Sequence, residues 1–343
     1  MSQASAEMHH AMRSSPPDAV DNTDWLKTAA IIFVSAGHFG FFFMEDELWW
    51  SVFGRFAAPP FFFLMGYAES RAVPLHWIGI GVILTLLESW NADWTWVAPN
   101  ILLSFVLIRI ARPYVQMLLQ NRGWLAFVIL VSVLLALLPA AAKIVDYGAE
   151  GWLWALFGLC QRRYLDGIST VATTGGTRGS PAPTLTATDA AGLMRLLACL
   201  VAAVVFVWQE QKEFSFPAVH LAVVILGLGV LSISLCLFTR GESRFQPPEK
   251  VAGTLRFVGR HTLEIYAIQL AGSELLVKLV PDLSALTRDR STLALLRYRI
   301  LMLAGTSILA LVDHLRPCDL PFKKKAQWRL RAEIHIAHHD SRP

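Results

Sequence analysis

The fold of this chain is decided by the stretch Trp25-Leu-Lys-Thr-Ala-Ala-Ile-Ile-Phe-Val-Ser-Ala-Gly-His38-Phe-Gly-Phe-Phe-Phe-Met44. Its length matches the ~20 residues with which a helix crosses a lipid bilayer. His38 lies near its middle, where an Arg, Lys or Asp side chain costs roughly 2.5–3.5 kcal/mol, so an ionisable group at that depth indicates a function. The same helical face carries four more polar residues: Asp24, Lys27, Thr28 and Ser35. We expect that face to pack against protein or to line an aqueous cavity, because lipid offers polar groups no hydrogen-bond partner.

The composition predicts a membrane protein. Hydrophobic residues make up 55% of the 343 residues and charged residues 16%, against roughly a quarter charged in a soluble domain. The mean hydropathy is +0.47. The expected fold class is all-α, a polytopic integral membrane helical bundle whose surroundings are the lipid bilayer. The pI near 8.9 does not indicate nucleic-acid binding, because the Lys and Arg residues are distributed as the expected membrane topology requires.

About ten transmembrane helices are expected from the apolar runs. They cover residues 25–44, 52–70, 74–88, 94–110, 123–145, 147–161, 190–208, 217–238, 258–279 and 293–314. Most Lys and Arg residues fall on one side of this arrangement, so the positive-inside rule predicts that both termini are cytoplasmic. The expected membrane domain covers 23–316, with a flexible cytoplasmic loop at about 165–189. A disordered tail (1–22) precedes it and a basic tail (317–343) follows it.

No metal site is predicted. The cysteines lie in or near apolar helices and show no metal-binding spacing, so we interpret them as core residues: Cys160, Cys199, Cys236 and Cys318.

Lys27 and His38 are eleven residues apart, which puts them on one helical face and about 16 Å apart along the axis. With a cytoplasmic N-terminus, Lys27 lies at the inner rim of the membrane and His38 near its middle. A cation at that rim can attract a phosphate-bearing donor, and a buried imidazole can accept a proton from a nucleophile. The spacing is equally compatible with a snorkelling lysine and a histidine that only packs.

The second expected span repeats this pattern of polar residues on one face. Arg55 is expected at its outer end and Glu69 at its inner end, too far apart for a direct ion pair. Pro59 and Pro60 free backbone carbonyls, which need a partner or a cavity. An alternative interpretation makes Arg55 an anchor at the membrane interface.

The ninth expected span is polar on two sides, which predicts a central place in the bundle. One stripe carries Arg260 and Glu264, an i,i+4 pair whose charges can neutralise each other. The opposite stripe carries Tyr266 and Gln269.

These three helices resemble the TraX proteins, a family named for pilin N-acetylation in conjugative systems. The matching residues are Asp24, Leu26, Lys27 and His38, then Gly54, Arg55, Ala57, Pro59, Phe61, Phe63, Gly66, Tyr67 and Arg71. The wider acyltransferase-3 class of membrane acyltransferases is similar in the spacing of Lys27 and His38, and Thr262-Leu-Glu-Ile-Tyr266 resembles a late helix of both groups. Three positions differ. Gly37 stands where TraX has Asp, Lys27 where the wider class has Arg, and Gln269 where both have a late His.

The resemblance implies an acyltransferase of the inner (plasma) membrane that moves an acetyl group to an amine or hydroxyl of a pilin N-terminus, glycan or lipid. It implies no bound cofactor, with acetyl-CoA or another acyl-CoA as co-substrate. The implied catalytic residues are His38, Arg55 and Tyr67. The implied substrate-binding residues are Lys27, Ser35, Glu69, Arg71, Arg260, Glu264, Tyr266 and Gln269.

In this scheme His38 is the general base or carries the acyl group, and Lys27 binds a donor phosphate. Arg55 orients the acceptor or stabilises negative charge, and Tyr67 and Tyr266 donate hydrogen bonds to the reacting carbonyl. Two other classes of protein also fit the polar stripe. One is a transporter or flippase-like carrier that uses the stripe as a path, and the other is an assembly protein without chemistry.

Overall fold

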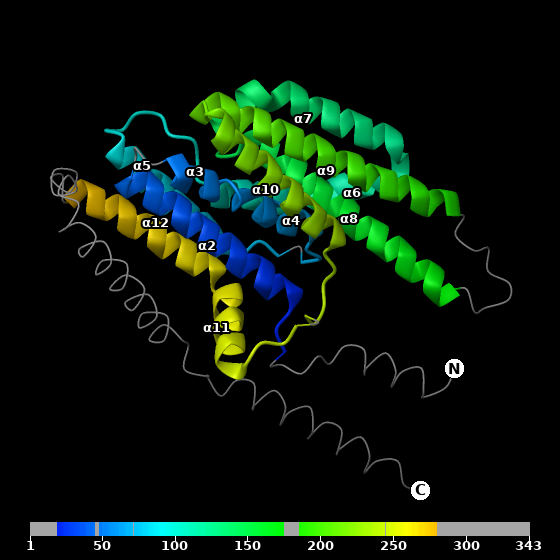
Figure 1. Ribbon diagram of the computed structural model, residues 1–343. Coiled ribbons are helices and arrows are strands. Elements are labelled where there is room, and N and C mark those ends of the chain that lie inside the picture. Colours follow the sequence, from blue (N-terminus) through cyan, green and yellow to red (C-terminus); the bar gives the residue numbers. More distant parts are fainter. Residues whose placement is uncertain (1–18, 45–47, 71, 175–184, 244, 280–343) are drawn as a thin grey trace, which may run out of the picture. The chain divides into compact units, whose positions relative to one another are not determined.

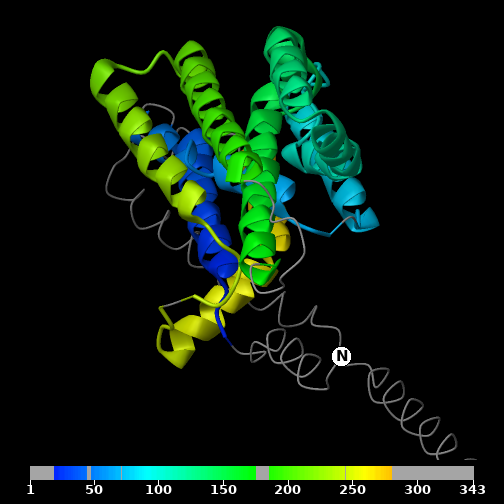
Figure 2. The same ribbon diagram turned by 90° about the vertical axis from the view of Figure 1, so that its right-hand side faces the viewer.

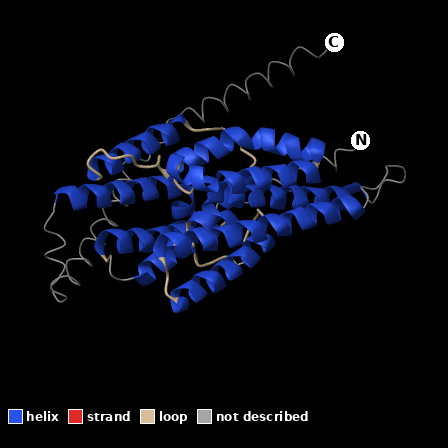
Figure 3. Ribbon diagram, turned by 90° about the horizontal axis from the view of Figure 1, so that it is seen from above, coloured by secondary structure: helices blue, strands red, loops and turns tan. Residues whose placement is uncertain are grey.

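The computed structural model of the chain describes residues 19–44, 48–70, 72–174, 185–243 and 245–279, all within one unit, residues 1–283. These residues form helices and no strand, which confirms the all-α prediction for the described part of the chain (Figure 3). The helices are α2 (Asn22–Phe43), α3 (Leu48–Gly54), α4 (Ala58–Tyr67), α5 (Leu75–Asn91), α6 (Ile101–Arg122), α7 (Trp124–Ile144), α8 (Gly148–Thr174), α9 (Leu185–Phe214), α10 (Ala218–Leu237), α11 (Glu249–Arg260) and α12 (Thr262–Leu279).

Five stretches of helix are long and apolar enough to cross a membrane. They are Asn22–Phe43, Ile101–Arg122, Trp124–Ala141, Asp189–Phe214 and Ala218–Leu237. The chain is therefore a helical membrane protein by the length and composition of its helices. The tenth expected span, 293–314, and most of both expected tails lie outside the described residues.

The start of α2 is held by its own side chains. Asp21 caps the helix by accepting a hydrogen bond from the Thr23 backbone N–H at 3.0 Å, and the Asp24 carboxylate accepts one from the Asp21 backbone N–H at 3.2 Å. This capping box fixes where α2 begins. It thereby places Lys27 in the first turns of the helix and His38 in its second half.

The span expected at 52–70 consists of parts of two helices rather than one. α3 ends at Gly54, and α4 begins at Ala58 with Pro59 and Pro60 in its first turn. Prolines are tolerated there because first-turn N–H groups have no partner within the helix. The break leaves Arg55 between the two helices.

α2 and α3 touch at two glycines. A Cβ atom built on Gly37 would lie 2.8 Å from the Gly54 Cα. No side chain fits at this crossing without moving a helix. A residue with a side chain, such as aspartate, therefore has no room at position 37.

Three other expected boundaries also shift. α6 begins at Ile101 rather than 94, because the Asn100 side chain caps it by accepting from the Leu102 backbone N–H at 3.2 Å. α8 continues to Thr174 and α9 starts at Leu185, so both helices extend into the loop expected at 165–189. The ninth expected span is interrupted at His261, where α11 ends and α12 begins.

α8 lies at the centre of the bundle and packs against α4, α7 and α9 (Figure 1). Its contact with α4 is close, since a Cβ on Gly66 would overlap the Ala155 carbonyl. Large fully buried side chains fill this region: Phe62, Phe63, Trp154, Phe157 and Phe206. α2 packs against α3, α11 and α12, and α12 also packs against α5.

The helices run back and forth between two ends of the bundle. At the first end, the Lys27 Nζ donates to the Gly259 carbonyl at 3.1 Å, which joins the start of α2 to the end of α11. At the second, Arg55 pairs with Glu210 of α9. We call these the Lys27 end and the Arg55 end. α11 crosses the Lys27 end at a steep angle to α12 (Figures 1 and 2).

Candidate functional site

A cavity of about 1500 Å³ lies inside the bundle. It exceeds the roughly 300–1,000 Å³ that is usual for small-molecule pockets. Most of the predicted site residues line it: Lys27, His38, Arg55, Tyr67, Glu69, Arg260, Glu264 and Tyr266. Ser35 and Gln269 are not among the lining residues, and Arg71 lies outside the described residues. The structure therefore gathers residues from α2, α4, α11 and α12, and from the segments on either side of α4, around one space.

His38 contributes an imidazole whose Nδ1 atom has no hydrogen-bond partner among the described residues. Its ring lies 5.7 Å from the Tyr266 ring and 6.3 Å from the Phe42 ring, measured between centroids. Its Nδ1 atom is buried and finds no hydrogen-bond partner among the described residues. A buried polar atom of this kind needs an explanation, and a ligand in the cavity is one.

Ser35 and Gln269 bond to each other. The Ser35 hydroxyl lies 3.1 Å from the Gln269 Oε1 and 2.8 Å from the Ile31 carbonyl of its own helix. The predicted polar stripe with Tyr266 and Gln269 thus faces α2. The contact between Ser35 and Gln269 holds α12 beside α2, next to the cavity.

Asn100 and Glu88 extend this polar region and were not predicted as site residues. The Asn100 side-chain amide donates to Glu88 Oε1 at 3.0 Å and to the Tyr266 hydroxyl at 3.2 Å. Asn100 is only 2% exposed, and all three residues line the cavity. Pro99-Asn100 before an apolar run is a helix-start signal, and it was the one available sign that Asn100 points away from a helix interior.

Arg55 is paired at the opposite end of the cavity from Lys27. Its guanidinium lies 3.1 Å from Glu210 Oε2 and 4.5 Å above the Phe214 ring. Glu210 is 2% exposed. Glu210 therefore neutralises the charge of Arg55. Sequence reasoning missed Glu210 because it lies just beyond the apolar run expected at 190–208.

The Arg55 end of the cavity is rich in carboxyl groups. Five acidic residues line it: Glu88, Asp146, Glu150, Glu213 and Glu274. Glu150 Oε2 is buried and finds no partner within the described part of the chain. Asp146 lies in the loop between α7 and α8, and burial raises its pKa to about 6.

The Lys27 end of the cavity carries cations together with the carboxylates of Asp21, Asp24, Glu69 and Glu264. Lys27, Arg109, Arg240 and Arg260 line it. Arg109 lies 4.4 Å from the centre of the Trp77 ring and donates to the Ala72 carbonyl at 2.6 Å. A guanidinium placed on an aromatic ring in this way keeps its direction.

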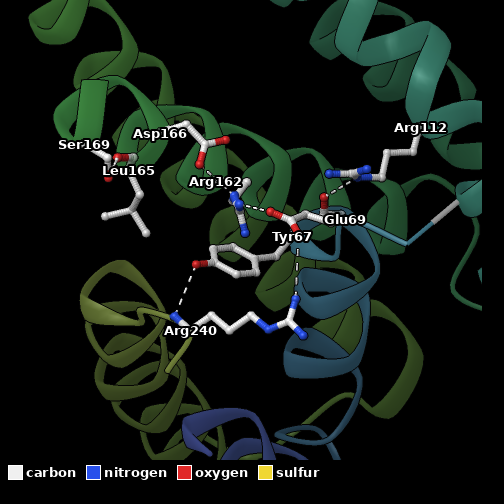
Figure 4. Close-up of polar contacts among 9 residues, drawn as sticks. Tyr67, Glu69, Arg112, Arg162, Leu165, Asp166, Ser169 and Arg240 are labelled. Carbon is white, nitrogen blue, oxygen red and sulfur yellow. Dashed lines mark hydrogen bonds and ion pairs between the residues drawn. The ribbon is translucent and has the colours of Figure 1, made fainter. Parts of the chain in front are cut away.

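Tyr67 and Glu69 also line this end of the cavity. Figure 4 shows their contacts with Arg162 and Arg240. The Tyr67 hydroxyl accepts a hydrogen bond from the Arg240 backbone N–H at 3.3 Å. Glu69 forms ion pairs with Arg162 of α8 and with Arg240, the latter at 4.0 Å. Glu69 and Arg55 are thus paired with different partners at different ends, as their predicted separation requires.

Among the described residues, no group of three or more His, Cys, Asp and Glu side chains is placed to hold a metal ion. No family model, curated protein or solved structure matches this chain.

Proposed function

We propose that this protein is an integral membrane acyltransferase that moves an acetyl group from acetyl-CoA to an amine or hydroxyl acceptor. One observation carries the proposal: the His38 Nδ1 atom, buried and without a hydrogen-bond partner among the described residues, belongs to a residue that lines a large cavity with charged groups at both of its ends. The resemblance to TraX and to the acyltransferase-3 class supports the same activity.

The proposed topology has ten spans, with both termini on the cytoplasmic side of the inner membrane. The Lys27 end then faces the cytoplasm, where acyl-CoA is available. The excess of Lys and Arg in the segments on that side supports this orientation.

In the proposed reaction, the phosphates of the donor bind at the Lys27 end and the thioester extends toward His38. The imidazole takes a proton from the acceptor, whose nitrogen or oxygen attacks the thioester carbonyl carbon. The carbon–sulfur bond then breaks, and the CoA sulfur leaves with a proton returned by His38. The Tyr266 hydroxyl, held by Asn100 beside the His38 ring, donates a hydrogen bond to the developing oxyanion in this scheme.

The acceptor enters from the Arg55 end in this scheme. Carboxyl groups there attract a positively charged group, so they favour an acceptor that carries an amine. Arg55 is held by Glu210 and orients the acceptor from the side of the cavity. Tyr67 lies at the donor end, which makes it a donor-binding residue rather than a partner of His38.

Transfer of labelled acetyl from acetyl-CoA in membranes tests the proposal. We expect His38→Ala to abolish transfer to the acceptor. His220→Ala is the matched control, because His220 is a membrane-helix histidine that packs on Trp49 and does not line the cavity. Equal activity in the two variants would remove His38 from the reaction.

A carrier is the second candidate function, because the cavity is lined by residues from both ends of the bundle. Binding of acetyl-CoA to purified protein separates the two functions. A carrier for another solute is expected to move that solute across vesicle membranes and to leave acetyl-CoA unbound.

A further inference from the structure

A single carboxylate lies between two arginines at the cytoplasmic end of the proposed site. Glu69, in the segment after α4, pairs with Arg162 of α8 and with Arg240 after α10 (Figure 4). The Glu69 side chain is 59% exposed and that of Arg240 is 57% exposed. Ion pairs this open to solvent are weak, so an incoming anion can replace the carboxylate.

The Arg162 side chain and the Arg240 backbone are held by contacts other than Glu69. The Arg162 Nε donates to Asp166 Oδ1 at 2.8 Å, and its guanidinium lies 5.6 Å from the centre of the Tyr67 ring. The backbone of Arg240 is held by the Tyr67 hydroxyl. Arg162 is thus positioned in advance for an anion, which lowers the cost of ordering its side chain on binding.

The cavity beside the two arginines is lined by charged groups of both signs, including the carboxylates of Asp21 and Asp24. Tyr67, Glu69 and Arg240 line the cavity, as do Lys27 and Arg109. Arg109 Nε is buried and lacks a hydrogen-bond partner in the described residues. A phosphate offers several oxygens to planar guanidinium groups, whereas Glu69 offers two.

We infer that Arg162 and Arg240 form a phosphate-binding site at the mouth of the cavity, and that Glu69 occupies it as an internal competitor until the ligand arrives. The identification of this phosphate with that of acyl-CoA rests on the proposed function. Binding of the anion itself does not rest on it.

The test measures affinity for inorganic pyrophosphate and for coenzyme A, using full-length protein in phosphatidylcholine nanodiscs. Glu69→Gln keeps the size of the side chain and removes its charge, so we expect both ligands to bind about two- to tenfold more tightly. Arg240→Gln is expected to weaken binding by a similar factor. Weaker or unchanged binding in Glu69→Gln would overturn the inference, because Glu69 would then support the arginines or lie outside the site.

Glu249→Gln is the matched control. Glu249 pairs with Arg256 on α11 at 2.6 Å, is 81% exposed and does not line the cavity. It changes the net charge by the same amount at the same end of the bundle. Equal tightening in both variants would show a general charge effect and would also overturn the inference.

Two further results separate the sources of the phosphate and the two proposals. The first result compares the pyrophosphate affinities of Glu69→Gln and wild type in nanodiscs that contain phosphatidylglycerol. If the two affinities become equal there, a lipid headgroup fills the phosphate site, and this result supports the site and identifies its ligand. If Glu69→Gln tightens pyrophosphate binding while wild type transfers no acetyl group, the anion site stands and the proposed acyltransferase activity fails.

Discussion

Gly37→Ala tests how α2 is placed, and with it the position of the neighbouring His38. The added methyl carbon would lie 2.8 Å from the Gly54 Cα, well inside the ~3.5–4.0 Å at which carbon atoms attract each other best. Both sides of this contact are backbone, so the helices α2 and α3 must separate. Overpacking of this kind costs about 1–3 kcal/mol.

Gly229→Ala supplies the comparison. Gly229 lies in α10, and no other described atom comes within 4 Å of a Cβ built there. Alanine favours a helix over glycine by about 1 kcal/mol at either position, so this gain cancels between the two variants. We therefore expect Gly37→Ala to be less stable than Gly229→Ala by about 1–3 kcal/mol.

The assay is reversible unfolding of the purified protein in mixed micelles, with acetyl transfer measured in parallel. Gly37→Ala should also lose activity, because it displaces the helix that carries His38. Equal stability of the two variants would refute the described crossing of α2 and α3.

Two further changes concern buried acidic groups. Glu210→Ala leaves Arg55 without its carboxylate partner, so we expect the free energy of unfolding to fall by about 3–5 kcal/mol in the same assay. The double variant Arg55→Met with Glu210→Leu should recover most of this loss. A small loss in Glu210→Ala would contradict the buried pair. Burial raises the pKa of Asp146 from 3.8 to about 6, so the folded state keeps a proton that the unfolded chain releases, and stability falls as pH rises through that window. Asp146→Asn should remove this fall, and unfolding profiles that stay parallel across the window would speak against it.

Long apolar runs made much of the fold predictable. The run that contains His38 forms α2 close to its expected bounds, and the runs of α7 and α10 do the same. The break at Arg55 was harder to predict, because Pro59 and Pro60 are compatible with a kinked helix as well as with a new start. The length of α8 was hard to predict because its sequence contains polar residues. Gln161 is one of them, and the structure satisfies it inside the bundle by hydrogen bonds to the carbonyls of Cys236 and Phe238.

The candidate site was predictable only in part. Helical periodicity placed Lys27 and His38 on one face, and the structure lines one cavity with both. The partners of these residues come from distant segments, as with Glu210 for Arg55 and Asn100 for Tyr266. No spacing along the chain encodes such pairs, because helix packing decides them.

The most direct measurement of the central claim is a cryo-electron microscopy structure with a hydrolysis-resistant acetyl-CoA analogue bound. The account predicts that the analogue's carbonyl lies within hydrogen-bond reach of His38 or Tyr266 and that its phosphates lie at the Lys27 end. An analogue bound elsewhere, or a His38 imidazole bonded to protein groups away from the ligand, would contradict it.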